Sequence, residues 1–279
     1  ELKPVNHETV FHIQTDWNEV TGFQGYLDRT ASTETAGGPM YVGNAGVAGV
    51  VAQLAVHAAI NSSVRDKRDK EAQDDANLVI TEYLDIVKTV DHNNFIEKPL
   101  FERSSLKVIA ERNSDESDKQ GSDIVVDLDP KYFMAQDENA LMLMMDMSVY
   151  RRANPQEIIF KQTIKSISSS ISSGNPDLVW KKGNPTYLEL TMQSLFDESV
   201  SVLLKDIAEP AALTQSEQST YKYSFGTKTR YERAYLIRAT CKRLYLKNLR
   251  GNIVAIPASD CIGDVSANVS ALPAGEQRK

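Results

Sequence analysis

Three apolar runs in the middle of the chain restrict its fold more than any other feature. In residues 124–129 the apolar Ile124, Val126 and Leu128 alternate with Val125, Asp127 and Asp129. Residues 141–149 are apolar almost throughout, and residues 158–167 form a third apolar run. Alternation with a period of two is typical of a strand with one buried face, and a continuous run is typical of a central strand covered on both faces. A stripe of apolar residues along 185–209 then predicts a long helix. This order predicts a layered sheet with a helix packed on it.

The segments before these runs add a strand and helices. Residues 9–15 alternate as a strand, residues 79–90 repeat apolar side chains at helical spacing, and a capping signal predicts a short helix at 100–111. The serine-rich residues 166–174 are expected to be mobile. We therefore expect one α/β domain at 1–210, followed by a polar linker at 214–220.

The predicted secondary structure changes after the linker to short strands alone. Short β runs at 221–225, 231–239, 242–249 and 252–256 are separated by glycine-containing turns. They predict a small antiparallel β meander at 221–258, too small to be stable alone, which either docks on the first domain or extends its sheet. Residues 259–279 are expected to form a C-terminal arm. The predicted fold class is α/β (α+β), a layered mixed sheet with helices followed by this meander.

The charge of the chain is concentrated in the meander. The whole chain has a net charge of −7, but residues 222–250 carry nine basic side chains and one acidic one, so this segment is +8 and the remainder −15. Two interpretations stay open: the basic segment complements the acidic domain, or it binds an external polyanion, with tyrosines stacking on bases or sugar rings. The candidate polyanion-binding residues are Arg238, Lys242, Arg243, Lys247, Arg250, Tyr235 and Tyr245.

Catalytic signatures are missing from the sequence. It contains no GxSxG, HExxH, GxGxxG or phosphate-loop motif and only four histidines. Asp127, Asp129 and Asp146 on neighbouring strands are the one carboxylate group that suggests a hydrolase, although outward-facing strand positions have the same pattern. Five methionines at 134–147 are expected to fill the core rather than bind copper(I), because consecutive strand residues face opposite ways. We predict no cofactor and no metal site.

Two further features bear on compartment and packing. Cys241 and Cys261 either form a disulfide, which would suit an oxidising compartment, or remain two thiols. The uncharged residues 42–60 favour a buried helix over a membrane span, because polar side chains interrupt them. Gly43, Gly46 and Gly49 recur every three residues there, which predicts a face where another backbone packs closely, within the domain or between subunits.

The order of these elements resembles a known group of proteins. A strand, an Ala/Gly-rich helix, the paired runs VVDLDPKYF and LMLMMDMSVY and a long amphipathic helix resemble the periplasmic α/β domain of bacterial outer-membrane lipoproteins. The curli-secretion-channel and penicillin-binding-protein-activator lipoproteins are the types named by this resemblance, which covers residues 8–209. It implies a lipid anchor just upstream of Glu1 and assigns no role to any residue.

The sequence thus supports three functional hypotheses. The first is a non-enzymatic periplasmic protein, anchored to the outer membrane by lipid, that acts as a scaffold or assembly component of an envelope complex. Its partners would be envelope proteins or further copies of itself. The second is a module that binds a polyanion through the basic meander: a nucleic acid, lipid head groups or an acidic polysaccharide. Nucleic acid is the least expected of these, given the net negative charge of the chain. The third is a carboxylate-based hydrolase.

Overall fold

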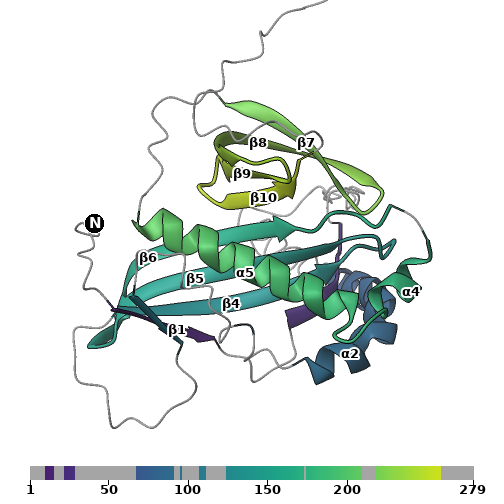
Figure 1. Ribbon diagram of the computed structural model, residues 1–279, viewed down its shortest axis with the longest axis horizontal. Helices are drawn as coiled ribbons and strands as arrows, with labels where there is room; N and C mark the ends of the chain where they lie inside the picture. The colour runs from purple at the N-terminus through teal and green to yellow at the C-terminus, as the bar shows by residue number, and fades with distance from the viewer. Residues whose placement is uncertain are drawn as a thin grey trace, which may run out of the picture.

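All the strands that the structure describes belong to one mixed sheet. The computed structural model describes residues 10–15, 22–28, 67–90, 95, 107–110, 124–172, 174–208 and 218–258. The sheet has ten strands in the order β3-β1-β4-β5-β6-β10-β9-β8-β7, with β2 beside β4 (Figure 1). The strands are β1 (Val10–Thr15), β2 (Phe23–Gly25), β3 (Lys107–Ala110), β4 (Ile124–Met134), β5 (Leu141–Arg151), β6 (Asn154–Ile167), β7 (Ser219–Phe225), β8 (Lys228–Ala239), β9 (Arg243–Asn248) and β10 (Ile253–Pro257). The predicted α+β layered class is confirmed.

Helices cover one side and one end of this sheet. The longest crosses β4, β5 and β6 diagonally, and the shorter ones gather at the end of the sheet where β4 finishes (Figure 1). They are η3 (Leu78–Tyr83), α2 (Leu84–Thr89), α4 (Pro176–Trp180) and α5 (Tyr187–Ala208), and residues 67–77 are also helical. The predicted long helix is therefore present.

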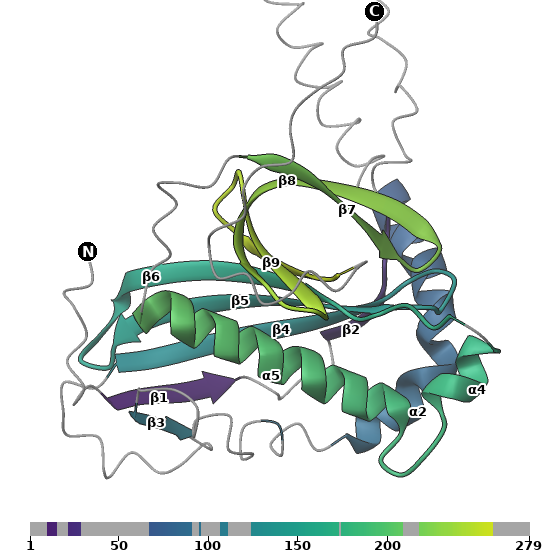
Figure 2. The same cartoon turned by 45° about the horizontal axis from the view of Figure 1, so that its top comes forward.

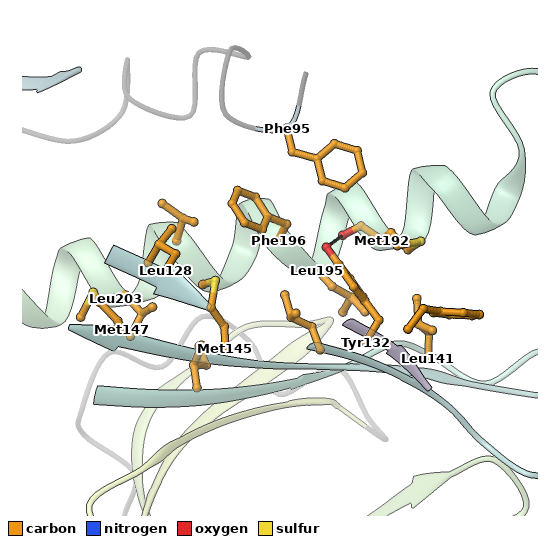
Figure 3. Close-up of a cluster of buried hydrophobic side chains, with 14 of the residues drawn as sticks. Phe95, Leu128, Tyr132, Leu141, Met145, Met147, Met192, Leu195, Phe196 and Leu203 are labelled. Carbon is orange, nitrogen blue, oxygen red and sulfur yellow. Dashed lines mark hydrogen bonds between the residues drawn. The ribbon is translucent and has the colours of Figure 1, made fainter. Parts of the chain in front are cut away.

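The main hydrophobic core lies between α5 and the antiparallel strands β4, β5 and β6. Figure 3 shows Phe196 and Leu203 of α5 directed at Met145 and Met147 of β5. The hydroxyl of Tyr132 donates to the carbonyl of Met192, 3.1 Å away, so this buried phenol is satisfied by the helix backbone. Because side chains alternate along β5, its methionines divide between the two faces. They fill the core as predicted, apart from the solvent-facing Met144.

The meander extends the sheet of the first domain. β10 pairs in parallel with β6, placing Ile253 beside Ile164, and β9, β8 and β7 follow as successive antiparallel neighbours. Figure 2 shows these strands arching above β6. Their inner side forms a second hydrophobic cluster with the other face of the sheet, and this cluster includes Met142, Ile167, Phe225 and Leu246. Of the two predicted arrangements, extension of the sheet is the one observed.

Some local predictions were wrong. Residues 107–110 form β3, parallel to β1, where a helix was expected. In the serine-rich segment, Ser166 is fully buried, and the hydroxyl of Ser168 accepts from the backbone N–H of Leu141, so these serines are fixed parts of the core. The long helix begins at Tyr187, two residues after the expected start, because Thr186 and Glu189 form a reciprocal capping box.

Candidate anion-binding surface

Four of the nine basic side chains of the meander form ion pairs with acidic side chains. Their acidic partners all lie in the first 210 residues. Arg230 and Lys228 pair with Asp28, at 2.6 and 3.4 Å, Lys247 pairs with Asp206 at 3.7 Å, and Arg243 pairs with Glu198. The meander and the acidic domain are therefore partly complementary in charge, which was one of the two interpretations left open by the sequence.

Glu198 of α5 is the centre of a polar network that joins several elements. Its Oε1 accepts from Arg243 Nε at 2.7 Å and from the Tyr245 hydroxyl at 3.0 Å, and its Oε2 accepts from Ser166 Oγ at 2.5 Å. The guanidinium also donates to the carbonyls of Ile167 and Ala255. The side chains of Glu198 and Arg243 are both only 16% exposed. The network joins α5 to β6, β9 and β10.

This network occupies two of the predicted binding residues. Burial, reinforced by the negative charge of Glu198, raises the pKa of Tyr245 to about 12, so the phenol stays protonated and donates. Arg243 already uses its donors within the fold. Neither side chain has capacity left for an external anion, and together they hold the meander against α5.

Tyr235 and Lys247 lie opposite each other on β8 and β9, on the same face as Arg243 and Tyr245. The structure thus brings together the predicted binding residues of these two strands, but on the side that faces α5. Lys247 reaches the carboxylate of Asp206, which is only 7% exposed. The hydroxyl of Tyr235 accepts from Gln218 Nε2 at 2.6 Å.

The other five basic side chains face outward. All are exposed, and none forms an ion pair with any residue in the described part of the chain. They are Lys222, Arg233, Arg238, Lys242 and Arg250. Arg238 lies over the ring of Tyr245, with 5.9 Å between the guanidinium carbon and the ring centroid. The prediction of a polyanion-binding surface therefore retains Arg238, Lys242 and Arg250, and gains Lys222 and Arg233.

The outer β7–β8 face carries two of these cations, Lys222 and Arg233. We use that name for Gln218, Thr220, Lys222 and Ser224 along β7, and Thr229, Tyr231, Arg233 and Tyr235 along β8. Lys222 lies directly opposite Tyr231, and Thr220 directly opposite Arg233. Tyr231 is 67% exposed, whereas Tyr223 and Phe225 on the other face are buried. The alternation of the two runs was visible in the sequence and could have identified this face.

A small pocket of about 160 Å³ lies at the inner end of the β7–β8 hairpin. Its charged groups are already matched, because Asp28 pairs with Arg230 and Lys228. Burial acts to raise the pKa of Asp137, but hydrogen bonds from Thr227 and Asn139 outweigh it, and the pKa is lowered. The pocket lies where the hydrogen bond from Thr227 to Asp137 fixes the hairpin to the turn before β5.

The three predicted carboxylates do lie on neighbouring strands. Asp129 of β4 is directly opposite Asp146 of β5. Asp129 pairs with Lys131 at 2.7 Å, and Asp146 accepts from Thr163 Oγ1 at 2.5 Å. Among the residues that the structure describes, no three His, Cys, Asp or Glu side chains are arranged to hold a metal ion. Asp129 and Asp146 are thus both engaged with neighbouring side chains of the sheet.

Other predicted features concern residues outside the described ranges. Gly43, Gly46, Gly49 and the segment 42–60 lie there, as do Cys261 and the arm at 259–279. No helix within the described ranges is long and apolar enough to cross a membrane. Cys241 is disulfide-bonded, and Cys261 is the one other cysteine of the sequence. Of the two states left open for the cysteines, the structure has the disulfide.

Reducing this disulfide should destabilise the protein measurably. A bridge that closes a loop of about 20 residues contributes on the order of 3 kcal/mol to the free energy of unfolding. We expect dithiothreitol to lower the melting temperature of the wild type to that of the Cys241→Ser variant, which itself should not respond. A wild-type melting temperature that is the same with and without reductant would contradict the assignment.

Comparison of the chain with known protein families, with curated proteins and with solved structures finds no match in any of the three.

Proposed function

We propose that the protein is a non-enzymatic component of a bacterial cell envelope that attaches itself to a polyanion through the outward-facing cations of its meander. One observation carries the proposal: five exposed basic side chains of the +8 segment have no acidic partner among the described residues. A segment whose only role was to neutralise the acidic domain would not need them. The proposal joins the scaffold hypothesis to the polyanion hypothesis.

The distribution of charge favours attachment in one orientation. A polyanion is attracted to the meander and repelled by the remainder of the chain, which carries a net charge of −15. The ion pairs that Arg243 and Lys247 form with acidic residues of α5 hold the meander on this helix. The five exposed cations therefore lie on a rigid support. Preorganisation of this kind reduces the entropy that binding costs.

The disulfide supports an extracytoplasmic location. Disulfides persist in oxidising compartments such as the bacterial periplasm and are rare in the cytosol. The bond at Cys241 is consistent with the periplasmic, outer-membrane-anchored location implied by the lipoprotein resemblance. In that setting the protein would act as a scaffold that connects an envelope complex to an anionic polymer or surface.

The proposal is tested by reversing charges on the meander. The variant Lys222→Glu/Arg233→Glu/Arg238→Glu/Lys242→Glu should lose about a hundredfold or more of its affinity for dextran sulfate and for polyphosphate at low salt. For the wild type, log K should fall linearly with the logarithm of salt concentration because counterions are released on binding. Fluorescence anisotropy of labelled polymers measures both quantities.

A matched control separates the surface from the total charge. The variant Arg68→Glu/Lys70→Glu/Lys182→Glu/Lys205→Glu makes the same change in net charge at four exposed positions outside the meander. It should bind nearly as well as the wild type. If the two variants lose affinity equally, or if the wild type binds none of these polymers, the proposed function is wrong.

A further inference from the structure

The geometry points to an acidic polysaccharide as the ligand, bound across the outer β7–β8 face. This inference rests on the proposed function and narrows it to one surface and one class of polymer. On this side of the meander α5 lies against Arg243, Tyr245 and Lys247 of β9, so the ligand must approach over the neighbouring strands β8 and β7. The outer β7–β8 face is the exposed part of the meander that carries both cations and tyrosines.

The composition of this face matches the chemistry of a charged sugar polymer. Its eight side chains are hydroxyl, amide, aromatic or cationic, and none is acidic or aliphatic. Hydroxyl and amide groups both donate and accept hydrogen bonds, as sugar hydroxyls do. Lys222 and Arg233 supply the positive charge for carboxylate or sulfate groups. The ring of Tyr231 supplies a flat apolar surface on which a sugar ring can stack.

The spacing of the groups suits a linear polymer. Tyr231, Arg233 and Tyr235 follow one another on the same side of β8, at steps of about 7 Å. Lys222 lies directly across from Tyr231, with the Cβ atoms about 5 Å apart. Along β8 the cation Arg233 therefore lies between the rings of Tyr231 and Tyr235. The second cation, Lys222 of β7, lies beside Tyr231. A chain of acidic sugars presents rings and charges in the same alternating order.

The face is held rigidly from below. Tyr223 and Phe225, on the opposite side of β7, are buried in the second hydrophobic cluster. Lys165 Nζ donates to the Tyr223 hydroxyl at 2.9 Å, and Thr227 at the end of the hairpin donates its N–H to Asp137. These contacts fix β7 and β8 in the free protein, so less conformational entropy is lost when a ligand binds.

Two other polyanions fit this face less well. A lipid surface is bound most strongly when apolar side chains enter the acyl region, and this face has no aliphatic group. A nucleic acid carries a phosphate on every nucleotide, whereas this face offers two cations within a protein of net charge −7. A polymer of lower charge density with hydroxyl groups between its charges is the better complement.

The test separates ring stacking from charge. The probes are polygalacturonate, which has sugar rings, and polyphosphate, which has none. Tyr231→Thr should weaken polygalacturonate binding on the order of tenfold and leave polyphosphate binding within about twofold of the wild type, whereas Tyr231→Phe should bind both polymers normally. Lys222→Gln/Arg233→Gln should weaken binding of both polymers. Tyr231 is exposed on a strand and threonine favours strands, so the fold should be kept.

The outcomes distinguish this inference from the proposed function. The glycan assignment is overturned if Tyr231→Thr changes the binding of both polymers equally or of neither. It is also overturned if phosphatidylglycerol vesicles or single-stranded DNA bind more tightly than polygalacturonate at equal concentration of charge. In these cases the proposed function still stands if binding depends on the five outward cations. If the wild type binds no polyanion, both fail.

Discussion

Replacement of Glu198 by alanine is expected to reduce the free energy of unfolding by about 3–5 kcal/mol, the range found when one partner of a buried ion pair is removed. The carboxylate of Glu198 accepts hydrogen bonds from Arg243, Tyr245 and Ser166. Without it, the guanidinium would stay in a site that is only 16% exposed, with no negative charge to balance it. Urea unfolding followed by circular dichroism measures the loss.

A double variant shows how much of this loss comes from the unpaired charge. Glu198→Leu/Arg243→Met replaces both partners by apolar side chains, and such replacements are often neutral for stability. We therefore expect it to be more stable than either single variant, with a coupling energy above about 1 kcal/mol. A double variant whose losses are simply the sum of the single losses would show that the pair does not stabilise the joint between α5 and the meander.

Replacement of Gly25 by alanine should also be severely destabilising, by about 3 kcal/mol or more. A Cβ atom at this position would lie 1.7 Å from the carbonyl oxygen of Ala76 and 3.0 Å from the backbone nitrogen of Asn77. Hydrogen bonds hold this close approach in place, because Asn77 accepts from the Gly25 N–H and Gln73 donates to the Gly25 carbonyl. The backbone of the helical residues 67–77 would have to move away from β2.

Gly251 provides the control for this prediction. It has a φ of +84°, and a Cβ there would meet no atom within 4 Å. Gly251→Ala therefore tests backbone strain without a steric clash, and should cost only about 1–2 kcal/mol. If Gly25→Ala is no more destabilising than Gly251→Ala in thermal or urea unfolding, the close packing of β2 against residues 67–77 is wrong.

The sequence predicted those parts of the fold that depend on local patterns. The four strands of the meander were predicted close to their observed bounds, because apolar and polar residues alternate and glycines mark the turns. The run at 141–149 was correctly placed as a central strand. It is covered on both faces only near Met142, because the second hydrophobic cluster reaches that end of β5 and leaves Met144 exposed.

The direction of the charged side chains could not be predicted in this way. Whether Arg243 faces inward depends on Glu198, which is 45 residues away in the sequence and meets it only after α5 has packed across the sheet. The direction of the Lys222 and Arg233 side chains depends only on the alternation of residues along each strand. Both could therefore have been assigned to the face opposite Tyr223 and Ala234. The serines of 166–174 were misinterpreted because composition does not reveal that Ser166 lies beneath Arg243 and Glu198.

The parallel pairing of β10 with β6 has a consequence for how the chain is assembled. β10, the last strand along the described part of the chain, fills a position in the middle of the sheet, between β6 and β9. Until residue 257 has emerged, β6 presents an open edge with its backbone groups unpaired, which is a template for pairing with another chain. Contacts between such distant segments also slow folding. Pairing of β10 with β6 thus closes an edge that an incomplete chain would expose.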